Sequence, residues 1–291
     1  MEYLILKNKS SRHISILLLL VLMISTIEGS LFPNLDIEKL LREELGIYTD
    51  TTEQILQATK SENGFVRLCA LELFKDRIGT KAIPTLKEAL DDQKMEVRWR
   101  AAHLLGTLDD KSGLERMKKD LMEFAPNNGA PVPLDPNVTD PNEIKEIEGK
   151  RNLRLSYALD AATVLAELGD RRGYELAVRM AFEGAWAVQR KKVVQVLVEI
   201  AKIDEKILAA EGKDPVIVLC AMAEFEKSRT VFRKLTSSVE ELRGDIAARV
   251  LEKAISSPHQ SELMRNAAKR KLERVRAKIK AAENKAKESS G

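Results

Sequence analysis

The feature that most constrains this chain is the window 82–113, which reads as one pair of antiparallel helices. Pro84 lies early in the first predicted helix and is expected to bend it, and the acidic pair Asp91-Asp92 ends that helix and starts a turn. Val97-Arg98 then opens a second helix, whose small and apolar residues recur at helical spacing: Ala101, Ala102, Leu105 and Leu108. A single helix pair cannot bury its own apolar face, so the window predicts a fold in which such pairs stack.

The second-helix pattern recurs along the chain. It consists of an apolar residue followed by Arg, a small pair four and five residues later, and apolar residues at the ninth and twelfth places, and the copies fit it with varying quality. Further copies begin at Val66, Tyr157, Gln189, Ile217 and Met264, and the copy from Ile217 has Phe225 at its ninth place. Successive starts are 31, 60, 32, 28 and 47 residues apart, so the step of 60 indicates an insertion. The motif Leu108-x-Asp110-x-x-Gly113 also recurs, as Leu168-x-Asp170-x-x-Gly173.

These residues resemble the HEAT repeat, especially its short bacterial form named after phycobiliprotein lyases. The resemblance extends over roughly 36–280 and implies an all-α fold, an α-solenoid of about six antiparallel helix pairs. It implies a non-catalytic protein-binding scaffold or adaptor whose partner is a protein or peptide. It also leaves open an alternative from another class, a lyase-like enzyme or a chromophore chaperone.

Composition agrees with a helical repeat. Only 4% of the residues are aromatic and 32% are charged, and no stretch alternates polar and apolar residues as a strand would. The net charge of +3 is too small to indicate a nucleic-acid partner, and none is expected.

The first 29 residues have the organisation of a secretory signal peptide. Lys7, Lys9 and Arg12 precede an apolar run over 14–24, and small residues follow it. We therefore expect an exported protein of the periplasm or cell envelope, cleaved near Gly29. The alternative is an uncleaved anchor formed by residues 14–27, which would hold the protein near the membrane.

After the signal segment, residues 30–281 are expected to form the solenoid and residues 282–291 a frayed tail. Five of the nine prolines lie in 123–152, so this segment is predicted to be a long projecting loop inserted in the array. Asp135, Asn137, Thr139 and Glu146 in it have the spacing of calcium ligands, but Asp140 stands where the turn glycine belongs. A solvated acidic turn is the favoured interpretation, and no metal site is predicted.

Catalytic chemistry is not indicated by the remaining reactive residues. Cys69 and Cys220 occupy the same place in two separate repeats, which predicts two buried thiols that do not pair. The histidines are His13, His103 and His259, and neither a nucleophile elbow nor a glycine-rich phosphate loop is present. We expect no catalytic residue and no cofactor.

Two surfaces remain as candidates for binding. At about 100° per residue, Trp99 and His103 fall on the side of their helix opposite Ala101. Because the second helices of HEAT-like folds line the concave face, Trp99, Arg100 and His103 are the candidate protein-binding residues, with Trp99 either an exposed anchor or a plug against the next repeat. The basic amphipathic stretch from Glu262 onward is expected to be a polar cap, although it could also contact anionic lipid or nucleic acid.

The signal-peptide prediction is tested by intact-mass analysis of the exported protein. We expect the mature chain to begin near residue 30, because the apolar run is shorter than the ~20 residues that an ordinary membrane span needs. A mass corresponding to a chain that still starts at Met1 would contradict cleavage and favour the anchor.

Overall fold

The structure is a computed structural model that describes residues 37–130, 138–182, 186–203 and 214–289. The signal segment, including the proposed anchor 14–27, lies outside these residues. Within the described ranges, no helix combines the length and the apolar character needed to cross a membrane.

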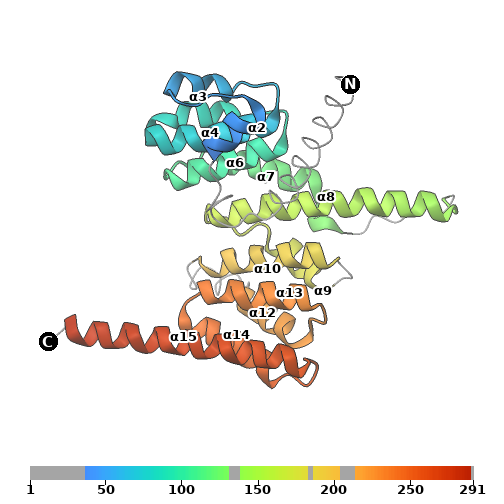
Figure 1. The fold of residues 1–291 in the computed structure, drawn as a ribbon. Helices are drawn as coiled ribbons and strands as arrows, with labels where there is room; N and C mark the ends of the chain where they lie inside the picture. The colour runs from blue at the N-terminus through green and yellow to red at the C-terminus, as the bar shows by residue number, and fades with distance from the viewer. Residues whose placement is uncertain (1–36, 131–137, 183–185, 204–213, 290–291) are drawn as a thin grey trace, which may run out of the picture. The chain divides into compact units, whose positions relative to one another are not determined.

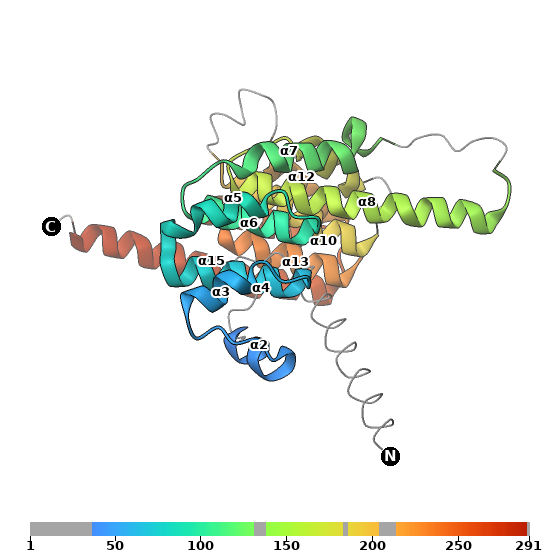
Figure 2. The same cartoon turned by 90° about the horizontal axis from the view of Figure 1, so that it is seen from above.

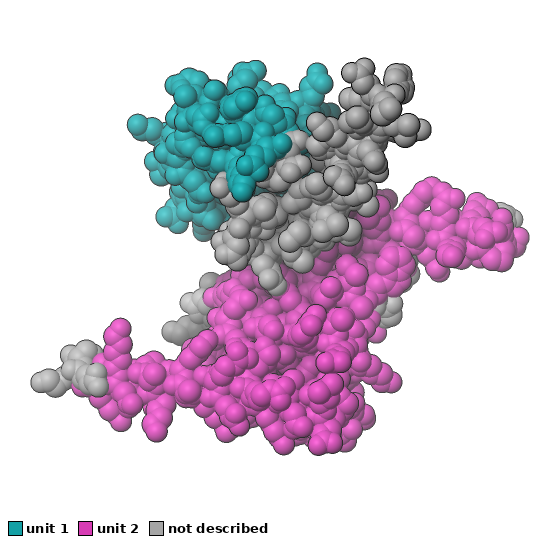
Figure 3. Space-filling view, viewed as in Figure 1, with its two compact units in different colours: residues 1–113 teal, residues 114–291 magenta. Residues whose placement is uncertain are grey.

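All regular secondary structure is helical, and the described residues contain no strand. The predicted all-α class is therefore confirmed. The chain divides into two compact units, residues 1–113 and residues 114–291 (Figure 3).

The first unit contains two helix pairs preceded by a short helix. Its elements are α2 (Ile37–Leu45), α3 (Thr52–Ala58), α4 (Gly64–Ile78), η1 (Gly79–Ala82), α5 (Ile83–Ala89) and α6 (Met95–Thr107) (Figure 1). Helix α3 packs on α4, α5 packs on α6, and α4 packs on α6. The second helices of the two pairs are therefore neighbours, as a repeating helix pair requires.

Local sequence sets the boundaries of these helices, with one departure from expectation. Thr51 caps α3, because its hydroxyl accepts a hydrogen bond from the Gln54 amide while the Gln54 side chain accepts one from the Thr51 amide. Pro84 was expected to bend the first helix of its pair from within, and it lies in the first turn of that helix, α5. A proline is tolerated there because the amide hydrogens of the first turn have no partner within the helix.

The second unit is built around α10 (Ala187–Ala201), which packs against α8 (Pro141–Glu167), α9 (Tyr174–Phe182), α12 (Pro215–Phe225) and α13 (Arg229–Ser238) (Figures 1 and 2). Helix α7 (Gly113–Phe124) and η2 (Pro126–Gly129) precede this group. The chain then continues through η3 (Val239–Glu241), α14 (Gly244–Ser256) and α15 (Glu262–Ser289), and α14 packs extensively on α15.

The expectation of a loop throughout 123–152 is wrong. Residues 123 and 124 end α7, and residues 141–152 form the first turns of α8. Asp140 caps this helix by accepting a hydrogen bond from the Asn142 amide, and Pro141 is its first residue, so the proline starts a helix instead of excluding one. We call residues 141–152 the α8 arm, which projects from the rest of the second unit (Figures 1 and 2).

The basic C-terminal stretch forms α15, as predicted. Its apolar residues share one buried face: Met264, Ala268, Leu272 and Val275. The helix continues to Ser289, so the part of the expected frayed tail that the structure describes is helical.

The repeated Asp-x-x-Gly motif is the same turn in both units. Asp110 and Asp170 each donate a backbone amide to the carbonyl of a leucine five residues earlier, and their side chains accept the amides of Ser112 and Arg172. A Cβ atom placed on Gly113 would lie 2.7 Å from the Ala102 Cβ. A Cβ atom placed on Gly173 would lie 2.4 Å from the Ala162 Cβ, so in both units the turn requires a glycine against an alanine.

We predict that Gly173→Ala destabilises the protein by ~1–3 kcal/mol, because the added methyl group overlaps the Ala162 methyl. Chemical denaturation measures this free energy of unfolding. Replacing Ala162 by Gly in the same chain should recover part of the loss. Gly149→Ala is the control, since a Cβ there meets nothing within 4 Å, and it should not lower stability. Equal effects of the two alanine substitutions would contradict the close approach.

Candidate functional site

The predicted binding residues of the first unit are largely buried. Trp99 is 6% exposed, so the expectation of an exposed aromatic anchor is wrong. The Arg100 side chain is 10% exposed and forms an ion pair with Glu72 of α4, and His103 is half-buried. Helical geometry correctly places Trp99 and Ala101 on different sides of α6. However, α6 packs against both α5 and α4, so the side of α6 that faces away from α5 is not open to solvent.

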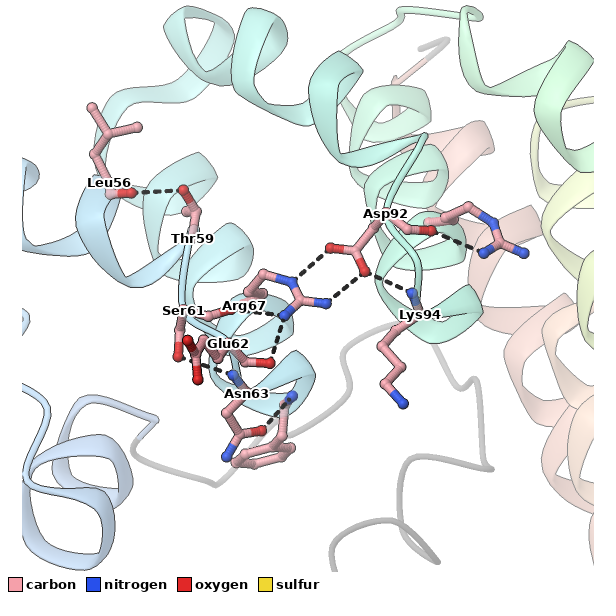
Figure 4. Close-up of polar contacts among 10 residues, drawn as sticks. Leu56, Thr59, Ser61, Glu62, Asn63, Arg67, Asp92 and Lys94 are labelled. Atoms are coloured by element: carbon pink, nitrogen blue, oxygen red, sulfur yellow. Dashed lines mark hydrogen bonds and ion pairs between the residues drawn. The ribbon is translucent and has the colours of Figure 1, made fainter.

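Arg67 of the repeat pattern ties neighbouring helix pairs together. Its Nε and Nη2 atoms donate to the two carboxylate oxygens of Asp92, each at 2.6 Å, and its Nη1 atom donates to the carbonyls of Ser61 and Glu62 (Figure 4). Asp92 precedes α6 and also accepts the Lys94 amide at 2.7 Å (Figure 4). The sequence pattern contained this arginine but did not show its partner.

The ion pair between Arg67 and Asp92 stabilises the charged form of each side chain. Burial alone would raise the pKa of the Asp92 carboxyl, but hydrogen bonds from Arg67 and Lys94 outweigh burial and hold this pKa below its ordinary value. The hydrogen bond to Asp92 raises the pKa of Arg67. The pair therefore contributes stability above the ordinary carboxyl pKa, and that contribution falls as the pH drops toward the lowered value.

The two cysteines are free thiols, as predicted. Cys69 is fully buried, and burial raises its pKa to about 12, so it is a poor nucleophile at neutral pH. Cys220 was also expected to be buried, but it is only half-buried; this partial burial raises its pKa as well.

No metal site is found in the part of the chain that the structure describes: no three His, Cys, Asp or Glu side chains come together there. Of the calcium-like spacing, Asp135 and Asn137 lie outside the described residues. Glu146 lies on α8 and forms an ion pair with Lys150 one turn later, at 2.6 Å.

In the second unit, hydrogen bonds and an ion pair made by largely buried polar side chains link four helices at one of their ends. Gln189 of α10 donates to the Asn152 carbonyl of α8 at 2.8 Å. Arg190 makes a two-pronged ion pair with Glu226, just after α12, at 2.7 and 3.0 Å. Gln260, just before α15, donates to the backbone carbonyls of Ala223, Glu224 and Glu226.

Large apolar side chains are exposed within a few residues of these ties, on α8, at the start of α10, at the end of α12 and at the start of α15. They are Leu153 (52% exposed), Trp186 (59%), Val188 (55%), Phe225 (52%) and Leu263 (53%). We call these five residues the apolar edge. The Phe225 ring lies against the His259 ring, with centroids 4.9 Å apart.

Basic groups border the apolar edge. Lys227 and Arg229 are exposed in the turn that follows Phe225, and Arg151 is exposed next to Leu153. Glu262 is the exposed acidic residue beside Leu263, and Glu226 is buried in its pair with Arg190. The border of the apolar edge is therefore mainly cationic.

Sequence reasoning missed the apolar edge, and one error shows why. The repeat copy placed at Ile217 put Ile217 and Phe225 in the core, but they are 59% and 52% exposed. The buried positions of α12 are instead Pro215, Val216, Val218, Leu219, Met222 and Ala223, so a copy that starts at Val218 has its small pair on the buried Met222 and Ala223. The pattern was therefore one residue out of register here, and the correct register would have left Phe225 on the surface.

Comparisons with known proteins add no family: no family model matches the chain, and no curated protein matches it.

We predict that Trp99→Ala lowers the free energy of unfolding by ~3–5 kcal/mol, the usual cost of removing a buried aromatic side chain. Tyr48→Ala is the matched control in the same unit. Tyr48 is 59% exposed and its ring contacts Arg42, so its removal should cost no more than ~0.5–1 kcal/mol. Both values come from chemical denaturation, and equal costs would show that Trp99 does not contribute to the core.

Proposed function

We propose that this chain is a non-catalytic, protein-binding scaffold of the cell envelope, built as a HEAT-like α-solenoid, and that the apolar edge is its binding surface. The observation that carries the proposal is the row of exposed side chains Leu153, Trp186, Val188, Phe225 and Leu263 beside buried hydrogen-bonded ties. Large apolar side chains gathered on a protein surface often mark a site that binds another molecule.

The ties suit this surface to protein recognition. Gln189, Glu226 and Gln260 are almost fully buried, so the backbone that carries the apolar edge is fixed before any partner arrives. Association then costs less conformational entropy than it would for a mobile surface. Trp186 supplies the residue type that most often dominates binding energy at interfaces, and the cationic border can add selectivity.

The solenoid part of the proposal rests on repetition. The same aspartate-capped turn and the same glycine-on-alanine contact occur once in each unit, and α4 packs on α6 as the second helices of successive repeats would. Export rests on the basic and apolar N-terminal residues. Together they make another envelope protein the expected partner.

The proposal is tested by comparing proteins captured from an envelope extract of the source organism. We expect the wild-type chain and the Tyr48→Glu control to retain the same proteins and Trp186→Glu to lose them, because a charge in the centre of an apolar contact cannot be desolvated cheaply. Trp186 and Tyr48 are equally exposed, at 59%, so the two substitutions disturb the fold to a similar extent. Retention that is the same for all three chains would contradict the proposal.

A further inference from the structure

Positive charge is concentrated at the C-terminal end of the chain. Residues 227–289 contain 17 Lys or Arg and eight Asp or Glu, so their net charge is +9. The whole chain has a net charge of +3, so the rest of it is acidic, with a net charge of −6. An asymmetry of this size indicates that the C-terminal part meets a partner that carries negative charge.

Two of the acidic side chains in this region are matched by particular basic ones. Glu240 accepts hydrogen bonds from Lys271 at 2.7 Å and from Arg274 at 3.3 Å, and Glu252 accepts one from Arg276 at 2.8 Å. Because basic residues outnumber acidic ones by about two to one over 227–289, such pairs neutralise only part of the charge. The excess positive charge remains on the surface of the second unit.

Four basic residues of α15 form one row along the helix. Arg270, Arg274, Lys278 and Lys285 follow one another at steps of four, four and seven residues, so they share one side of it. All four are exposed. The acidic residues of α15 whose side chains are described lie about 100° or more around the helix from Arg274: Glu262, Glu273 and Glu283.

Helix α13 extends this row into a surface. Lys271 of α15 donates to the Ser237 hydroxyl of α13 at 2.9 Å, and three residues further along both helices Arg274 reaches Glu240. The two helices are therefore neighbours that run in the same direction. Arg233 is exposed one turn before Ser237, and α13 itself contains no acidic residue. We call five exposed residues the basic face: Arg233, Arg270, Arg274, Lys278 and Lys285.

Helix α15 continues past the helix that packs on it. Ile279 still lies against the start of α14, since a Cβ atom placed on Gly244 would be 2.5 Å from the Ile279 Cγ1 atom. Residues 280–287 are all exposed, and this end of α15 projects from the second unit (Figures 1 and 2). No apolar residue larger than alanine occurs in 280–289, whereas a helix that docks in a protein groove needs large apolar anchors. Charge is therefore the property by which this segment meets a partner.

An anionic lipid surface fits the basic face better than a nucleic acid does. Leu263, which is 53% exposed, lies seven residues before Arg270 and so on the same side of α15. At a bilayer such a side chain enters the interface while basic groups reach the lipid headgroups. Contacts to a nucleic-acid backbone come from basic and polar groups and leave the leucine without a role. The envelope location also brings a membrane within reach, and to that extent the inference rests on the proposed function.

We propose that the basic face binds the surface of a membrane that contains anionic phospholipid. Helix α15 lies along this surface, and from Leu263 to Lys285 it extends about 33 Å. Leu263 belongs to the apolar edge as well, so the lipid-binding and protein-binding surfaces adjoin at that residue. The basic face gives the protein an electrostatic attachment to the membrane that is separate from its N-terminal segment.

The test is sedimentation of the purified full chain with lipid vesicles, at low and at physiological salt. Vesicles of phosphatidylcholine alone are compared with vesicles that mix it with the anionic phosphatidylglycerol. We expect binding that is tighter to the mixed vesicles and that weakens as salt is added, because salt screens the attraction between the basic face and the headgroups.

A double substitution locates the surface. Arg270→Gln together with Lys278→Gln should weaken binding to the mixed vesicles about twenty-five-fold, because each basic residue near an anionic membrane contributes roughly fivefold. Lys60→Gln together with Lys81→Gln is the matched control. It removes the same charge from exposed positions of the first unit and should leave vesicle binding unchanged. Circular dichroism would check that both double variants keep the wild-type helix content.

The other outcomes would overturn the inference. Equal binding to the two kinds of vesicle would show attachment through apolar residues, such as the run 14–24, instead of charge. Equal weakening by the two double variants would show that the basic face has no special part in binding. Binding to a DNA or RNA oligonucleotide without binding to the mixed vesicles would make a nucleic acid the partner.

Capture of envelope proteins by the apolar edge is measured independently of vesicle binding. The variant with Arg270→Gln and Lys278→Gln should retain that capture, because neither residue belongs to the apolar edge. A wild-type chain that fails to bind mixed vesicles, but whose capture of proteins is lost with Trp186→Glu, would overturn this inference and leave the proposed function standing.

Discussion

Burial of α10 from several sides is the constraint on which the second unit depends. Its residues 193–198 and Ile200 are all buried, because α8, α9, α12 and α13 surround it. Residues 193–198 span more than one full helical turn, so this stretch is covered on every side, which requires neighbours all around it. The neighbours must be held in place, and polar ties do so on both sides: Lys192 of α10 donates to Asp160 of α8 at 2.5 Å, and Arg190 holds Glu226 beyond α12.

In the first unit, which has fewer helices, a polar interaction also holds neighbouring helices in place. Arg67 fixes Asp92 at the turn before α6, so the neighbouring helices α4 and α6, which belong to successive helix pairs, are joined by a buried ion pair as well as by packing. Such pairs add little net stability compared with apolar residues of the same shape, but breaking one leaves a buried charge alone. Their value here is positional, since they define which turn of one helix pair meets which turn of the next.

In a protein built of packed helices, a binding surface is expected where no further helix packs on the exposed side chains. Where helices pack side by side, their apolar residues are buried against one another. Trp99 is an example, because it was predicted to be a binding anchor and is instead buried. At the helix ends of the second unit no further helix of the described chain covers Trp186, Val188 or Phe225, although the ties beneath them are complete. In the α8 arm, Ile144 and Ile147 continue the buried face of α8 beyond the part of the helix that is packed in the core.

The sequence by itself determined the helical class, the turn at Asp91-Asp92, the repeated Asp-x-x-Gly turn and the core positions of most repeat copies, because spacing and local hydrogen bonding decide these features within a few residues. Only the tertiary structure decided which side of α6 was open, since that depends on neighbours distant in sequence. It also decided that 141–152 is helical, where proline content had suggested a loop, and that Phe225 is exposed, where a one-residue error in register had placed it inside. The apolar edge joins residues from four helices, and no local pattern in the sequence brings them together.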